Sequence, residues 1–127
     1  MNSLRERIVE LAYQNPGVGG AKCAALLVRR NEVLGTGFNT KKSHPLQARF
    51  SRNRHSIYLH AEIDALRSAL RESSVDYVAG ADMLVARTHK DGTLALSKPC
   101  QGCQQALAAF EVSSVVWTIN KGWSDDR

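Results

Sequence analysis

The spacing of hydrophobic residues predicts a helix at the start of the chain and then an antiparallel hairpin. Apolar residues recur at helical intervals over 4–12, behind a Ser-x-x-Glu capping box that begins at Ser3. Two short apolar runs, 24–29 and 33–37, are separated by a tight turn, which is typical of paired strands. Residues 38–56 show no such pattern, and a loop of that length is uncommon in a compact domain unless it has a function.

Helices and strands alternate in the rest of the chain. Apolar residues at steps of four, three and four predict a helix over 59–70, whose exposed face carries Asp64, Arg67 and Arg71. The elements expected after it are a buried strand at 83–87, a helix from about Cys100, a strand at 114–119 and a short antiparallel strand at Trp123. This order predicts one α/β domain over 1–127, with a mixed sheet of four to five strands between helical layers.

Composition supports a single folded domain. The 127 residues are 43% hydrophobic and 23% charged, which excludes disorder as the main state. No apolar stretch reaches the roughly 18 residues of a membrane span, and the N-terminus lacks the apolar core of a secretory signal. Three cysteines are too few for a disulfide framework and favour a reducing compartment. We therefore expect a cytoplasmic protein with no membrane partner.

The excess positive charge lies in one segment. The net charge is +5, and no acidic residue occurs between Glu32 and Glu62. The cations in that interval are Lys41, Lys42, Arg49, Arg52 and Arg54. A single basic loop suggests one localised anion, whereas a merely solvated charged face is the alternative.

Two segments, each at the predicted start of a helix, carry the candidate chemistry. The first is His60-Ala61-Glu62, and the second is Pro-Cys-x-x-Cys with thiols at Cys100 and Cys103. One imidazole and two thiolates leave a fourth tetrahedral position for water, as in catalytic zinc sites. Glu62 follows the histidine by two residues and can take a proton from the zinc-bound water. Either motif alone would be weak, since a lone Cys-x-x-Cys is also a redox pair or half of a structural zinc site.

Four motifs together give the chain its family resemblance. They are AALLV (24–28), GTGFN (35–39), HAEIDAL (60–66) and SKPCQGC (97–103). With them the chain resembles the cytidine and deoxycytidylate deaminase superfamily, whose zinc enzymes carry the His-x-Glu and Pro-Cys-x-x-Cys pattern. The resemblance implies a three-layer α/β/α fold, Zn²⁺ held by one histidine and two cysteines, and a homo-oligomeric assembly.

The resemblance also implies roles for individual residues. Zinc-activated water would attack the amino-bearing ring carbon, and Glu62 would shuttle the protons as ammonia leaves. Asn39 would hydrogen-bond the substrate, and the backbone N–H groups of Ala61 and Cys100 would face the base and the hydroxide. From the residues themselves, we add Lys41, Arg52 and Arg54 as candidate phosphate contacts and Tyr58 as a candidate stacking residue.

Three hypotheses about the function stay open. The basic loop favours a cytosine nucleotide of the CMP or dCMP type over a free nucleoside. The alternative is a cytosine or adenine within single-stranded DNA or RNA, including tRNA, with Phe50 and Tyr58 as stacking platforms. A zinc-binding scaffold without activity is the third, and Glu62 beside three ligands argues against it.

Overall fold

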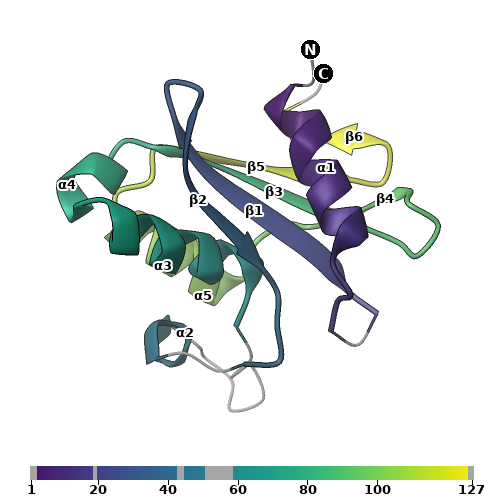
Figure 1. The fold of residues 1–127 in the computed structure, drawn as a ribbon, viewed down its shortest axis with the longest axis horizontal. Helices are drawn as coiled ribbons and strands as arrows, with labels where there is room; N and C mark the ends of the chain where they lie inside the picture. The colour runs from purple at the N-terminus through teal and green to yellow at the C-terminus, as the bar shows by residue number, and fades with distance from the viewer. Residues whose placement is uncertain (1–2, 19, 43–44, 51–58, 126–127) are drawn as a thin grey trace.

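The computed structural model describes residues 3–18, 20–42, 45–50 and 59–125 and shows a sheet with helices on both faces (Figure 1). The helices are α1 (Leu4–Gln14), α2 (Pro45–Phe50), α3 (Ala61–Glu72), α4 (Val75–Val78) and α5 (Gln101–Ala109). The strands are β1 (Lys22–Arg29), β2 (Glu32–Phe38), β3 (Asp82–Thr88), β4 (Leu94–Ala95), β5 (Ser114–Ile119) and β6 (Gly122–Trp123).

The sheet is mixed, as the sequence predicted. Five strands lie in the order β2-β1-β3-β5-β6. The two-residue strand β4 is outside this order and pairs with β3. Strand β1 is antiparallel to both of its neighbours, β3 is parallel to β5, and the final pair β5–β6 is antiparallel. Helix α1 covers one face, while α3 and α5 cover the other (Figure 1). The three-layer α/β/α architecture expected from the resemblance is therefore confirmed.

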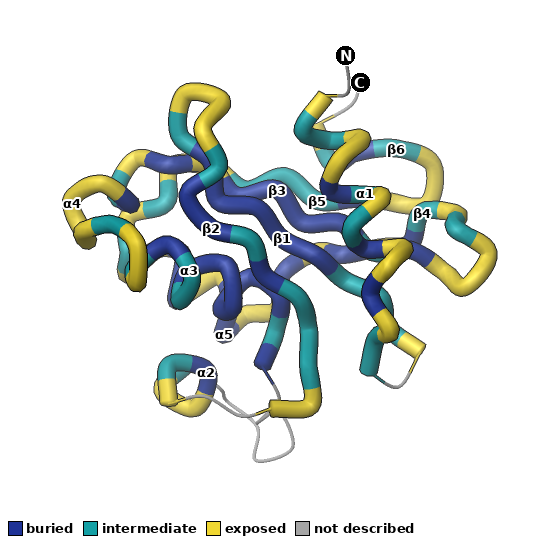
Figure 2. The backbone as a smooth tube through the Cα atoms, in the orientation of Figure 1, coloured by how far each residue is buried: buried dark blue, intermediate teal, exposed yellow. Residues whose placement is uncertain are grey.

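Most residues of the central strands β1 and β3 are buried (Figure 2). Side chains alternate across a strand, so Ala25 and Leu27 of β1 join the cluster under α3 and α5. Ala24 and Leu26 join the second cluster, which includes Ile8 of α1. A strand with two buried faces reads as a continuous apolar run, which explains the motif at 24–28.

Glycines in β2 let this strand approach α3 closely. A Cβ built on Gly37 would overlap the carbonyl oxygen of Ala61 and the backbone nitrogen of Ala65. Gly35 lies in the same way against Ala65 and Ala69, one turn further along the helix. The end of β2 is thereby held against the first turn of α3, where the His-Ala-Glu motif begins.

Two expectations about local structure are wrong. The loop expected over 38–56 contains a helical turn, α2, at Pro45–Phe50, which is too short to produce a periodic pattern. Asp64 was expected on the exposed face of its helix, yet it is buried, whereas Arg71 is exposed. The carboxylate of Asp64 accepts a hydrogen bond from the backbone N–H of Phe38 at 2.9 Å and pairs with Arg67. Asp64 thus joins α3 to the end of β2.

The N-cap predicted at Ser3 agrees with the structure. The Ser3 hydroxyl accepts a hydrogen bond from the backbone N–H of Glu6 at 3.1 Å and caps α1. Arg5 pairs through both guanidinium nitrogens with Asp125, at 2.9 and 2.7 Å, which joins α1 to the C-terminal segment. Within the described residues, no helix combines the length and apolar character that crossing a membrane requires.

Candidate metal centre

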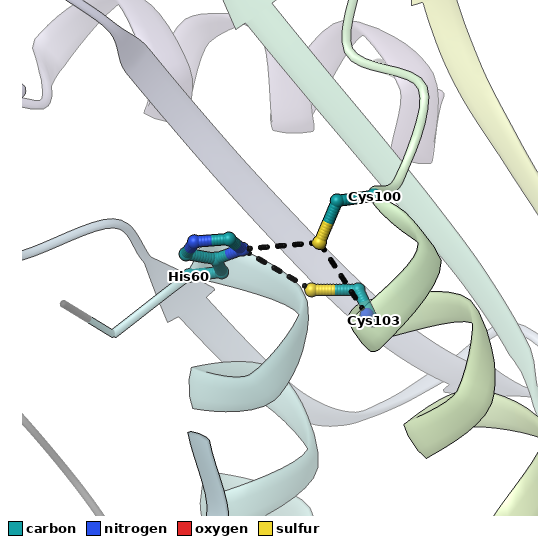
Figure 3. Close-up of side chains that lie close together, drawn as sticks. All are labelled: His60, Cys100 and Cys103. Atoms are coloured by element: carbon teal, nitrogen blue, oxygen red, sulfur yellow. Dashed lines mark hydrogen bonds between the residues drawn. The ribbon is translucent and has the colours of Figure 1, made fainter. Parts of the chain in front are cut away.

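Three side chains from the starts of two helices converge at one point (Figure 3). His60 lies directly before α3, Cys100 is the N-cap of α5, and Cys103 lies in the first turn of α5. Nδ1 of His60 is 3.3 Å from Sγ of Cys103 and 3.6 Å from Sγ of Cys100. The candidate ligand atoms all lie within 4.8 Å of one another.

These distances fit a zinc ion. Zinc binds thiolate sulfur at about 2.3 Å and imidazole nitrogen at about 2.0–2.1 Å, so tetrahedral angles separate N from S by about 3.6 Å. The two N···S separations lie close to this value. Two sulfurs and one nitrogen are also the donor types that zinc prefers, and three protein ligands leave one position for water.

The start of α5 is arranged to hold a thiolate. Sγ of Cys100 accepts a hydrogen bond from the backbone N–H of Cys103 at 3.5 Å, as an N-cap side chain does. The hydrogen bond with the Cys103 thiol, and then that with His60, lowers the pKa of Cys100 to about 3. The same contact with Cys100, together with burial, raises the pKa of Cys103. Hydrogen bonding to Cys100 also raises the pKa of His60.

Glu62 lies beside the metal cluster in the first turn of α3 without belonging to it. The residue is buried, and burial raises the pKa of its carboxyl group above the ordinary range. A carboxyl group with a raised pKa accepts a proton more readily than an ordinary one and can return it to a neighbouring group. The proton transfer expected of Glu62 from the sequence stays a prediction.

A pocket of about 250 Å³ opens onto the cluster. Its lining residues come from both helix starts, from the ends of β1, β2 and β3, and from the segment before α5: Ala21, Cys23, Asn39, His60, Ala61, Glu62, Val85, Arg87, Leu96, Ser97, Lys98 and Cys100. Of the predicted substrate contacts, Asn39 and Ala61 line this pocket. Lys41 is exposed and does not line it. Arg52, Arg54 and Tyr58 lie outside the described residues.

The Asn39 amide is fixed by three hydrogen bonds. Its Oδ1 accepts from Nδ2 of Asn15 at 2.6 Å and from the backbone N–H of Cys23 at 3.1 Å. Its Nδ2 donates to the carbonyl oxygen of Ala21 at 3.0 Å. Because an amide nitrogen carries two hydrogens, one donor remains available to a ligand in the pocket.

Several residues that support or line this site were not predicted from the sequence. The Gln47 side chain, buried in α2, accepts a hydrogen bond from the backbone N–H of His60 at 3.0 Å. Asn15, which was expected only to end the first helix, holds the Asn39 amide. Arg87 and Lys98 bring two cations to the pocket wall. Only Arg87 had a detectable signal, since it alternates with Val85 along β3 and must share its face.

The fold and the site together define a zinc-dependent enzyme of the deaminase type. Residues 3–119 match the cytidine and deoxycytidylate deaminase zinc-binding region, so the chain belongs to this family of hydrolases. The resemblance drawn from the sequence, the zinc cofactor and the enzymatic character are all confirmed. A search of curated proteins finds no match.

Solved structures share this fold at low sequence identity. The dCMP deaminase of cyanophage S-TIM5 in its apo form is 23% identical, with a TM-score of 0.63 over 94% of this chain and 86% of that one. Cytidine deaminase from Mycobacterium tuberculosis is 21% identical, with a TM-score of 0.51 over 94% and 86%. A diaminohydroxyphosphoribosylaminopyrimidine deaminase/reductase from Thermotoga maritima is 21% identical, with a TM-score of 0.53 over 88% of this chain and 27% of that one. These proteins differ in substrate, so their likeness shows the fold alone.

Proposed function

We propose that this chain deaminates a cytosine mononucleotide, of the CMP or dCMP type, to the uracil form with release of ammonia. The observation that carries the proposal is one pocket that joins the His60, Cys100 and Cys103 cluster to a buried carboxyl group and two cations. The S-TIM5 dCMP deaminase was also solved with dCMP and dUMP, at 19% identity and a TM-score of 0.55 over 89% of this chain and 74% of that one.

The reaction converts cytosine and water into uracil and ammonia. Zinc held by His60, Cys100 and Cys103 would supply an activated water and positive charge beside the ring. Glu62 accepts the proton that the water loses and delivers it to the base. Glu62 then carries the second proton of that water, from the oxygen now bonded to the ring, to the amino group, which leaves as ammonia while the carbonyl of uracil forms. Burial keeps bulk water away from Glu62 and raises its pKa, which makes the protonated form accessible during turnover.

Two further groups orient the substrate in this proposal. The remaining amide hydrogen of Asn39 donates to a sugar hydroxyl, because its other polar atoms are already engaged. The backbone N–H of Ala61 lies at the N-terminus of α3, where it has no intrahelical partner and faces the base.

A substrate panel scored by ammonia release tests the function. It contains cytosine, cytidine, deoxycytidine, their mono- and triphosphates, adenosine, guanine and a single-stranded oligonucleotide. We expect the highest kcat/KM for CMP or dCMP, with a shallow dependence on salt. Turnover confined to the oligonucleotide, with a steep salt dependence, would support the nucleic-acid alternative instead. Phe50, offered as a stacking platform for that alternative, packs partly buried against the core.

We also propose that the chain acts as a single-domain homo-oligomer. A domain of 127 residues buries a smaller share of its surface than a larger one, so self-association would stabilise it. Light scattering at micromolar concentration measures the assembly directly, and a monomer there contradicts it.

A further inference from the structure

Arg87 occupies a position in β3 that faces the pocket. Its Cα pairs with Cys23 in β1 on one side and with Ala95 in β4 on the other. Side chains alternate along a strand, so Arg87 shares the face of Val85, and both residues line the pocket. The backbone N–H of Arg87 donates to the Thr118 hydroxyl at 3.1 Å, which fixes the strand at this point.

One buried donor of the Arg87 guanidinium has no partner among the described residues. Its Nε is buried and makes no hydrogen bond within the described residues, and no described carboxylate forms an ion pair with it. By contrast, Arg29 donates to the carbonyl oxygens of Tyr77 and Ala79 at 3.0 and 2.7 Å. A buried guanidinium donor without a partner is costly, and an anion is the partner that it binds best.

Lys98 adds a second cation to the same pocket. It lies two residues before Cys100, on the segment that leads into α5, and is exposed. Its Nζ lies 6.0 Å from the centroid of the Trp117 ring. Glu62 is the only acidic residue among the described lining residues, so cations outnumber acids by two to one. The pocket therefore favours an anionic ligand.

We propose that Arg87 binds the phosphate group of the mononucleotide substrate, with Lys98 as the outer cation. This inference rests on the proposed function and names the residues that recognise its phosphate. A guanidinium offers two parallel N–H donors to phosphate oxygens, which a lysine does not. The proposal places the phosphate at the pocket wall. Among the loop cations that the structure describes, Lys41, Lys42 and Arg49 do not line the pocket, while Arg52 and Arg54 lie outside the described residues.

The test is the ratio of kcat/KM for dCMP to kcat/KM for deoxycytidine in the zinc-loaded Arg87→Gln variant. We expect the dCMP value to fall about ten- to a hundredfold, mainly through KM, while the deoxycytidine value stays within about twofold. Arg87→Lys should recover part of the ratio, because it restores the charge without the paired donors. Lys98→Gln should lower the ratio less, because this residue is exposed.

Lys22→Gln is the matched control. Lys22 precedes Cys23 in β1, so its side chain leaves the opposite face of the sheet, where Nζ lies 4.5 Å from the centroid of the Tyr13 ring. Removing this charge should leave the ratio unchanged. An unchanged ratio in Arg87→Gln, or an equal loss for both substrates, overturns the assignment of Arg87.

Failure of the proposed function gives a different result. If the unmodified chain deaminates neither CMP, dCMP nor their nucleosides, the proposed function is wrong. Calorimetric binding of UMP and uridine then tests Arg87 by itself. UMP that binds more tightly than uridine to the unmodified chain, but not to Arg87→Gln, supports the phosphate contact. If Arg87→Gln does not fold, the same ratio of kcat/KM values is measured in Arg87→Lys and Lys98→Gln. A ratio that is unchanged in both variants overturns the proposal.

Discussion

The two faces of the sheet differ in role: alternate residues of the same strands pack against a helix on one face and line a pocket on the other. On the α1 face, Lys22 lies over the Tyr13 ring, and Ile8 is fully buried against the strands. On the other face, Cys23 and Arg87 line a pocket beside the metal cluster. One step along β1 or β3 therefore separates a packing residue from a pocket residue, because side chains alternate across the sheet.

The second face receives two helix N-termini at this end of the sheet. Helices α3 and α5 both begin there, with His60 before one and Cys100 capping the other. Free backbone N–H groups and the helix dipoles stabilise thiolates and other anions at such starts. Helix α1 presents its side to the sheet and contributes packing. Chemistry and stability should therefore respond to different sets of substitutions.

The largest effect should come from removing a metal ligand. Cys100→Ala is expected to lose zinc and all measurable turnover together. Because Cys100 is exposed, deleting its side chain leaves little cavity, so any fall in thermal stability reports the loss of metal-linked folding energy. Metal analysis and thermal melts with and without added zinc measure this. Full activity in metal-free protein would contradict the conclusion that this face carries a zinc site needed for activity.

Glu62→Gln should separate chemistry from metal binding. Turnover is expected to fall by about 10²–10⁴-fold, since the amide keeps the shape but cannot take a proton. Zinc content should stay at the level of the unmodified chain, because Glu62 lies outside the ligand cluster. Glu10→Gln, on exposed α1 surface, is the matched control. If zinc leaves together with Glu62, its assigned role is wrong.

Ile8→Ala tests the opposite face. The side chain is fully buried, so its truncation should lower the free energy of unfolding by about 2–5 kcal/mol. Denaturant titration of the zinc-loaded protein measures this loss. Zinc content and kcat/KM at a temperature where the variant is folded should remain unchanged. A selective loss of zinc in Ile8→Ala would show that the faces are coupled.

Gln47→Ala should weaken zinc binding without abolishing it. The buried amide accepts a hydrogen bond from the backbone N–H of His60, so its loss leaves the ligand less well positioned. We expect zinc affinity to fall by about tenfold or more, as for other residues that orient metal ligands. Competition with a chelator measures the affinity. Gln47→Glu retains an acceptor oxygen and should bind zinc more tightly than Gln47→Ala.

The smallest effect concerns Cys23 and pH. Burial, and after it the negative charge of Glu62, raises the pKa of the Cys23 thiol from 9.0 to about 11. The unfolded chain therefore releases this proton first, and the free energy of unfolding should fall as pH rises from about 9 to 11. Cys23→Ala should lack this part of the fall. Denaturant titrations of both proteins across that range measure the difference; parallel curves would exclude a raised thiol pKa.

Much of this protein could be predicted from local sequence. The elements around 4–12, 59–70 and 114–119 were correct because hydrophobic periodicity reports which face of each element is buried. The ligand types and the carboxyl group were predictable because His-x-Glu and Pro-Cys-x-x-Cys specify donors and spacing together. These are properties of short segments, so they can be predicted without knowing which distant segments pack together.

Only the tertiary structure decided what supports and surrounds the cluster. Asp64 was predicted on the polar face of its helix, yet it is buried. Strand β2 packs so closely on α3 that the Asp64 carboxylate accepts a hydrogen bond from the N–H of Phe38. Gln47 reaches His60 from a helical turn that has no periodic signal. Cations are concentrated at 41–54 in the sequence, yet the cations that line the pocket among the described residues are two isolated ones, Arg87 and Lys98. Charge along a sequence does not reveal which side chains meet, because that depends on how distant strands and helices pack.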